Sequence, residues 1–484
     1  MSKARAAIRA NTSGIEFVAL FALILISVPR ISAKFGPLPI YFIDFIVIAM
    51  FYKASRAPAF PMQFTPFLRL ISCILALAVF SEIKTFAISG GSLESMYILM
   101  RTVLSFSVFY SISRLVRTPS DVMFVLKAVS LGLLFNSLLM ILTSLPMTRG
   151  LTSILFSTSF LEPAAVKSEM MSRFMETGDI GQRGRTLVGV SILAATFSNV
   201  AWPMAAALVV WPDLKKIWRR IAIIACILAP ISVLMSYSRG PILGSLLIFI
   251  AAIFFGLKKI RKLILLPVVL LIIGVGVAGV ESNLFFFDRL INRTVVIYDR
   301  NFEDERESER ILAYVEPFEH VIRNPIYAFI GEGIAPNRSG LSSIQNQAAT
   351  HALFAKAYYS YGMVAAILYM VLIFGMLKYS YTRIRKQKSE SGSLIGQAIF
   401  ASVLALFSWF AFGHAMVSSP RGAMLMFFVF GLSVALCHFH PRLSRRKLSR
   451  PVDIHLTPGN ASRPVDVHPT PGTANRPVDI LLTR

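Results

Sequence analysis

Charged residues are scarce in this chain. Asp, Glu, Lys and Arg together make up 15% of its 484 residues, whereas hydrophobic residues make up 55% and the mean hydropathy is +0.65. Soluble domains carry about 25% charged residues on average. The composition therefore excludes an ordinary soluble protein and indicates an integral membrane protein.

Cysteine and metal-binding patterns are also scarce. Cys73, Cys226 and Cys437 fall within separate apolar runs, which indicates neither a disulfide framework nor a thiolate metal site and leaves the redox compartment open. The group of Cys437, His438 and His440 lacks a fourth ligand of matching type, and the chain contains no Asp-x-Asp pair. We therefore expect no bound metal.

About 12 apolar runs are long enough to cross a bilayer, which takes about 20 residues each. Backbone groups cannot remain unpaired in lipid, and long apolar runs exclude the short alternating strands of a barrel, so these runs predict helices. The expected fold is all-α, a polytopic membrane protein of about 12 transmembrane helices with a large outer loop between helices 9 and 10. The runs lie near 15–33, 38–54, 66–86, 95–116, 121–145, 187–211, 219–237, 240–257, 262–280, 352–377, 394–415 and 420–438.

Lysine and arginine collect on one set of alternate connections, which the positive-inside rule places in the cytoplasm together with both termini. The segments 146–186 and 281–350 then lie outside. The net charge of +24 is mostly a signal of this topology, so the expected partner is anionic membrane lipid and not nucleic acid. The basic residues are Lys3, Arg5, Arg9, Lys53, Arg56, Arg114, Arg117, Lys215, Lys216, Arg219, Arg220, Lys258, Lys259, Arg261, Lys262, the cluster 378–388 and the cluster 442–447.

The end of the chain has a different composition. A motif that begins Ser449-Arg450-Pro451 recurs from Ser462 and, with Asn in place of Ser, from Asn475. Such a segment buries too little apolar surface to offset its ordering entropy, so we expect a disordered cytoplasmic tail, inert in preference to partner-docking. The predicted division is 1–280 for transmembrane helices 1–9, 281–350 for an outer loop with an amphipathic helix, 351–440 for transmembrane helices 10–12, and 441–484 for the repeat tail.

The outer loop 281–350 holds much of the candidate chemistry. Apolar residues at helical spacing between Phe302 and Arg323 predict an amphipathic helix. Arg306 and Arg310 on this helix are candidates for recognition of phosphate or sugar. The alternative, favoured for an isolated charge run, is a solvated face on which they pair with neighbouring glutamates.

Arg239 is a candidate for binding an anion. It sits on a tight turn at the outer membrane boundary, and the next helix is expected to start near Pro241. A guanidinium beside the free amides of a helix N-terminus makes an anion site, although a plain interfacial arginine is an equal alternative. Arg183 and Arg185 precede the sixth helix on the same face and are candidates to clamp a second phosphate, or merely flank that helix.

His351 is the most obvious general base of the outer loops. Histidine titrates near neutrality and can take a proton from a hydroxyl, although an interfacial histidine bonded to lipid is the plainer alternative. Charged residues inside apolar runs are costly and therefore functional suspects, and Lys356 is the best of them because it follows His351 closely. The others are Asp44, Arg101 and Lys127.

A set of short motifs, taken in order, resembles the O-antigen ligase and polymerase family. They cover roughly 235–375, and the helix count and the large outer loop extend the resemblance over the membrane portion. The motifs are Ser238-Arg239-Gly240, Ser308-Glu309-Arg310, Asn324-Pro325, Gly331-Glu332-Gly333, His351-x-x-Phe354 and Tyr361-Gly362.

The resemblance implies a metal-independent, inverting glycosyltransferase without a cofactor. It would transfer a polyprenyl-pyrophosphate-linked glycan to a hydroxyl acceptor at the periplasmic face of the bacterial inner membrane. Carried over to this sequence, His351 activates or orients the acceptor hydroxyl and Arg239 binds the pyrophosphate, which Lys356 could also face. Arg185 is a looser match to a second arginine, with Arg183 as the alternative register.

Two activities of the family remain open. Polymerases join repeat units to one another, whereas ligases move finished glycan onto lipid A-core. We favour a polymerase of exopolysaccharide or O-antigen, because nothing in the sequence resembles a lipid A recognition surface. Polysaccharide-assembly proteins are the expected protein partners.

A transporter is the alternative from another class. A major-facilitator protein has about 12 helices in two similar halves, with a long linker between helices six and seven. Here that connection is short, near 212–219. A glycan flippase would need charged residues deep in the bundle, and a nonenzymatic anchor would leave His351 and Arg239 unexplained.

Overall fold

The computed structural model describes a helical protein. The described residues are 2–28, 31–35, 38–57, 65–88, 93–144, 191–236, 238–255, 257–269, 322, 325–331, 333, 353–386, 390–412 and 420–435. Most of the outer loop 281–350, its predicted amphipathic helix and the tail 441–484 lie outside these ranges. The all-α class is confirmed, while the domain boundaries remain predictions.

The helices follow the predicted apolar runs. Five of them, α3, α5, α8, α9 and α17, are long and apolar enough to cross a membrane, and shorter apolar stretches lie in α1, α10, α18 and α19, counted over the described residues. In chain order the helices are α1 Ser2–Ser27, α2 Phe42–Ser55, α3 Thr65–Ile88, α4 Leu93–Leu115, α5 Pro119–Ser144, α8 Ser191–Val209, α9 Lys216–Leu234, α10 Arg239–Phe254, α14 Ile326–Phe329, α16 Leu353–Tyr361, α17 Met363–Lys386, α18 Glu390–Phe412 and α19 Pro420–Ala435.

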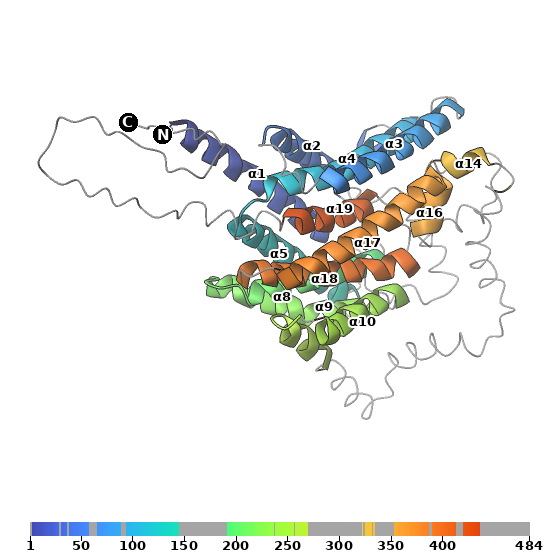
Figure 1. Cartoon of the computed structure of the whole chain (residues 1–484). Coiled ribbons are helices and arrows are strands. Elements are labelled where there is room, and N and C mark those ends of the chain that lie inside the picture. Colours follow the sequence, from blue (N-terminus) through green and yellow to red (C-terminus); the bar gives the residue numbers. More distant parts are fainter. Residues whose placement is uncertain are drawn as a thin grey trace, which may run out of the picture. The chain divides into compact units, whose positions relative to one another are not determined.

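The helices pack in two groups with a layer between them (Figure 1). Helices α2, α3 and α4 lie together, as do α8, α9 and α10, and helices α17, α18 and α19 lie between the two groups. Helix α19 packs against α4, whereas α18 packs against α8 and α10. Helix α5 contacts α1, α8 and α9, and α17 of the middle layer contacts both α3 and α18.

Polar side chains join α5, α8 and α9 inside the bundle. The Asn136 amide donates to the Ala194 carbonyl and to Ser198 Oγ, both at 3.0 Å. Ser232 Oγ lies 3.3 Å from Ser137 Oγ and from Ser198 Oγ. Interhelical hydrogen bonds of this kind hold transmembrane helices together where lipid provides no hydrophobic driving force.

Helix α5 begins with a reciprocal capping arrangement. Thr118 Oγ1 accepts from the Asp121 backbone N–H at 3.2 Å, and Asp121 Oδ2 accepts from the Thr118 backbone N–H at 2.8 Å. Pro119, whose missing N–H needs no partner in the first turn, starts the helix. This capping box lies directly after Arg117, in the connection that follows α4, and it fixes the start of α5.

A short hairpin between α1 and α2 departs from the sequence prediction. Strand β1, Ser32–Phe35, pairs antiparallel with β2, Leu38–Tyr41, so that Ser32 lies opposite Tyr41. The apolar run near 38–54 predicts a helix from its first residue, whereas α2 begins at Phe42. The Gly36-Pro37 pair is a turn signal, and Pro39 disfavours helix for the residue before it. The hairpin thereby places Tyr41 at the start of α2.

Glycine allows the close contact between α4 and α19. A Cβ added at Gly431 would lie 2.9 Å from Ile112 Cβ and 3.3 Å from the Phe109 carbonyl oxygen. Gly431→Ala should therefore force the two helices apart and cost about 1–3 kcal/mol of stability. We expect a lower melting temperature for the purified protein in detergent.

Gly375→Ala is the matched control for this variant. A Cβ at Gly375 would meet only Phe67 Cε1, at 3.4 Å, and alanine favours the helix by about 1 kcal/mol. Its melting temperature should equal or exceed that of the wild type. Equal melting of the two variants would contradict the assigned contact between α4 and α19.

Candidate active site at one end of the bundle

The structure describes part of the predicted site. His351, Arg183, Arg185, Arg306 and Arg310 lie outside the described residues. Arg239 and Lys356 are described as helical positions, in α10 and α16, without their side chains. Their roles therefore remain predictions, and the geometry of the site comes from the residues around them.

Helix α10 starts at Arg239, two residues before the predicted start. Ser238 is its N-cap residue, with extended backbone dihedrals of φ −115° and ψ 124°, and its side chain makes no capping hydrogen bond. The first helical bond recorded at this end runs from the Ile242 N–H to the Ser238 carbonyl, at 3.3 Å. The amides at the start of a helix are a ready binding site for an anion.

Asn199 of α8 holds the first turn of α10 in place. Its Nδ2 donates to the Pro241 carbonyl, and its Oδ1 accepts a hydrogen bond of 2.7 Å from Ser245 Oγ. Asn199 is 1% exposed, so both ends of its amide are used within the protein. The start of α10 is therefore positioned by a neighbouring helix and not by its own loop.

The apolar run near 352–377 forms two helices and not one. Helix α16 ends at Tyr361, Gly362 has a φ of 93°, and α17 starts at Met363. A side chain rarely adopts a positive φ, so glycine allows this break. We call the segment 360–362 the α16–α17 junction.

Gly331 and Gly333 of the predicted glycine motif lie against this junction. The Gly333 N–H donates to the Ser360 carbonyl at 2.7 Å, and Gly333 has a φ of 77°. A Cβ added at Gly331 would lie 2.2 Å from both the Ser360 carbonyl carbon and the Tyr361 nitrogen. Two motifs that are separate in sequence therefore meet at one backbone contact, and both need glycine there.

Helices α3 and α4 complete the junction. Lys84 Nζ donates to the Gly331 carbonyl at 3.1 Å. The Tyr361 side chain is hydrogen-bonded to Thr102 of α4 and lies near Glu82 of α3, and both Tyr361 and Glu82 are fully buried. Glu82 and Lys84 were not among the predicted site residues, although two charged residues near the end of an apolar run were the available signal.

Helix α10 begins at the end of the bundle that holds the junction. Helix α17 leads away from the junction, and α18, joined to it by a short connection, returns alongside it. Beyond the C-terminus of α10, the Lys259 N–H donates to Gln397 Oε1 near the start of α18, at 3.2 Å. The far end of α10 therefore lies away from the junction, and its N-terminus points back toward it.

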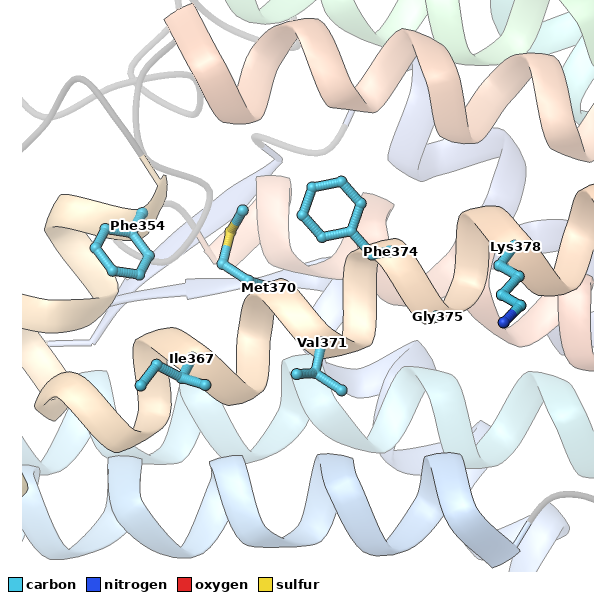
Figure 2. A pocket seen from close by; sticks show the side chains of 7 residues that line it. All are labelled: Phe354, Ile367, Met370, Val371, Phe374, Gly375 and Lys378. Carbon is cyan, nitrogen blue, oxygen red and sulfur yellow. The ribbon is translucent and has the colours of Figure 1, made fainter.

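An apolar groove runs along α17 (Figure 2). Its volume is about 460 Å³, and its lining comes from α16 and α17. Ile367, Val371 and Phe374 on this face are each about half exposed, and Lys378 at one end is the single charged residue of the lining. Such a lining suits an apolar chain and gives a sugar no hydrogen-bonding partners. The remaining lining residues are Phe354, Met370 and Gly375.

The contact at Gly331 can be tested directly. Gly331→Ala should displace the motif from the α16–α17 junction, and a misplacement of about 1 Å can cost about 100-fold in rate. We expect glycan product to fall by about 10-fold to 100-fold at equal protein level in the membrane. Arg220→Ala, at an exposed position near the start of α9, should retain wild-type product. An unaffected Gly331→Ala would show that the contact does not matter for function.

Comparison with known families covers this region. Residues 224–370 match the family model described as O-antigen ligase. The matched segment begins in α9, includes all of α10 and α16, and ends in α17, so it contains Arg239, Gly331, His351 and the α16–α17 junction. A search of curated proteins gave no match to the chain. The match over 224–370 supports the resemblance to the O-antigen ligase family that the motifs indicated.

Proposed function

We propose that this protein is a membrane glycosyltransferase that moves a polyprenyl-pyrophosphate-linked glycan onto a hydroxyl acceptor. The observation that carries the proposal is the O-antigen ligase match over 224–370, the segment that contains both the start of α10 and the α16–α17 junction. The reaction would take place at the periplasmic face of a bacterial inner membrane.

The chemistry requires that the charge of the leaving group be matched. A pyrophosphate leaves readily when cationic groups bind it, and arginine supplies forked donors without a divalent ion. Arg239 at the amides of α10 is the first such group in our proposal, with Arg185 or Arg183 and Lys356 as further contacts. Arg306 and Arg310 would contact the glycan or its phosphates.

The transfer itself is a single displacement. The acceptor oxygen attacks the anomeric carbon from the side opposite the pyrophosphate, which leaves with the electrons of the broken bond, so the configuration inverts. His351 takes the proton of the acceptor hydroxyl as general base, or orients that hydroxyl. No metal and no cofactor take part in this proposal.

The lipid part of the donor needs an apolar surface next to the site. The groove along α17 supports this requirement, because it begins at Phe354 of α16 and is apolar except for Lys378. The short connection between α8 and α9, from Val209 to Lys216, speaks against a major-facilitator transporter, which has a long linker between its halves.

Loss of the proposed catalytic groups should abolish product. His351→Ala removes the general base, a contribution of about 100-fold to 10,000-fold. Arg239→Ala removes a charged contact to the leaving group, worth about 100-fold or more. Both variants should insert in the membrane at wild-type level and give no detectable polymer.

Arg220→Ala is the matched control, because it removes an exposed arginine near the N-terminus of α9, the end that lies far in sequence from Arg239. It should retain product. Full activity in both His351→Ala and Arg239→Ala would overturn the site assignment.

The two activities of the family can be separated in cells. We propose a polymerase, with an O-antigen ligase as the alternative, and the test is deletion of the gene followed by gel analysis of lipopolysaccharide and exopolysaccharide. A polymerase predicts single repeat units on lipid A-core or loss of secreted polymer. Bare core with long lipid-linked chains would identify a ligase instead, and unchanged glycans would overturn the transferase proposal.

A further inference from the structure

The groove along α17 ends at a lysine that the proposed reaction leaves unused. Phe354 and Ile367 line the end of the groove nearer the α16–α17 junction, and Lys378 lines the other end (Figure 2). From Met363 to Lys378 the helix rises about 22 Å, at about 1.5 Å per residue. The hydrocarbon core of a bilayer is about 30 Å thick. Lys378 therefore lies near the membrane boundary opposite the junction, close to the end of the apolar span at Thr382.

The apolar lining leads directly to this lysine. Val371 and Phe374 lie one and two turns before Lys378 on the same face of α17, and both are about half exposed. Gly375, which has no side chain, lies between them and the lysine and keeps the groove open there. A Cβ at Gly375 would have only Phe67 Cε1 as a neighbour, at 3.4 Å. The surface next to Lys378 can therefore hold a hydrocarbon chain.

Two tyrosines flank Lys378, and neighbouring elements hold them in place. The ring centroid of Tyr379 lies 5.4 Å from that of Phe67 on α3, with the rings at 75° to each other. The ring centroid of Tyr381 lies 6.1 Å from that of Phe255, which directly follows α10. Tyrosine is enriched at the level of the lipid headgroups, where its ring is in an apolar layer and its hydroxyl in a polar one. Lys378 is therefore at headgroup level within a packed setting.

Further basic residues lie on the elements that hold these tyrosines. Arg69 of α3 and Lys258, just beyond α10, are both exposed. The sequences of α10 and α17 contain no acidic residue, α3 contains only Glu82, which lies at the junction, and α18 contains only Glu390, its first residue. Basic residues thus outnumber acidic ones around this end of the groove. Such a surface attracts anionic lipid headgroups.

The two ends of the groove suit two different molecules. A lipid-linked donor with its pyrophosphate at the junction would direct its hydrocarbon toward Lys378, and a charged ammonium gains nothing from hydrocarbon and loses water to it. A phospholipid of the opposite leaflet has the reverse orientation. Its phosphate lies at the boundary where Lys378 lies, and its acyl chains point toward the middle of the membrane, along Phe374 and Val371.

We propose that the Lys378 end of the groove binds an anionic phospholipid of the leaflet opposite the α16–α17 junction, with its phosphate at Lys378 and one acyl chain along Phe374 and Val371. In the predicted topology this is the cytoplasmic leaflet, the one that the positive-inside rule assigns to the basic connections. The proposed site lies away from the candidate catalytic residues, so it does not rest on the proposed function.

The test is lipid-dependent melting of the purified full-length protein in dodecyl maltoside. Phosphatidylglycerol should raise the melting temperature at lower concentration than phosphatidylcholine does, because a ligand of the folded state stabilises it. Lys378→Gln removes the charge at the end of the groove. It should raise the concentration of phosphatidylglycerol needed for half of the effect by about 5-fold, and it should leave the response to phosphatidylcholine unchanged.

Further variants separate the headgroup from the acyl chain. Lys378→Arg keeps the charge and should keep the response to phosphatidylglycerol. Val371→Trp fills the groove from a half-exposed position and should weaken the response to both lipids. Lys216→Gln is the matched control, because it removes an exposed lysine at the start of α9, outside the groove lining. It should keep the wild-type response, as should His351→Ala.

Three results would overturn the lipid site. Equal responses of the wild type and Lys378→Gln to phosphatidylglycerol would leave Lys378 as a lysine that only reaches the headgroup layer. An equal loss in Lys378→Gln and Lys216→Gln would show a general attraction of basic surface for anionic lipid. A response that depends on Lys378 for undecaprenyl phosphate but not for phosphatidylglycerol would assign the whole groove to the donor. A response to phosphatidylglycerol without any glycan transfer would support the lipid site and remove the transferase.

Discussion

A bilayer provides no water to a backbone amide or a buried charge, and the architecture of this protein follows from that constraint. Helices satisfy the backbone within each segment, and the polar side chains between them find partners on neighbouring helices. Asn136 and Ser232 do so between α5, α8 and α9. Lys127 reaches the face of the Trp218 ring, at 5.6 Å. Asp44 of α2 and Arg101 of α4 form a buried ion pair of 3.6 Å between neighbouring helices.

Glycine residues at the candidate site allow close contacts between backbone segments. At Gly331 there is no room for a side chain, and at Gly333 and Gly362 the backbone has a positive φ. These residues bring Gly331 and Gly333 against the α16–α17 junction, and Lys84 of α3 donates a hydrogen bond to the Gly331 carbonyl. Motifs that are read in sequence as family markers thus become one piece of packed backbone, which gives their residue types a physical reason.

Much of the fold was predictable, because helices that cross a bilayer without water must be long and apolar and therefore stand out in the hydropathy of the sequence. The run near 66–86 became Thr65–Ile88, and the run near 121–145 became Pro119–Ser144. The hairpin was missed because local turn signals at Gly36 and Pro37 were outweighed by the apolar composition of the run. The contacts of Asp44 with Arg101 and of Lys84 with Gly331 join residues far apart in sequence, and nothing in local periodicity encodes them. Arg239 was predicted from its turn, whereas the bracing of that turn by Asn199 depends on tertiary packing.

Tyr41 contacts parts of the chain that are synthesised at very different times. It stands at the start of α2, yet it contacts Arg421 at the start of α19, the last described helix. Chains emerge from the ribosome N-terminus first, so Asp44 and Arg101 can pair while most of the protein is still being synthesised. The second guanidinium arrives only when α19 inserts beside α4. A truncated chain that lacks α19 would therefore contain the Asp44–Arg101 pair but not the contact of Tyr41 with Arg421.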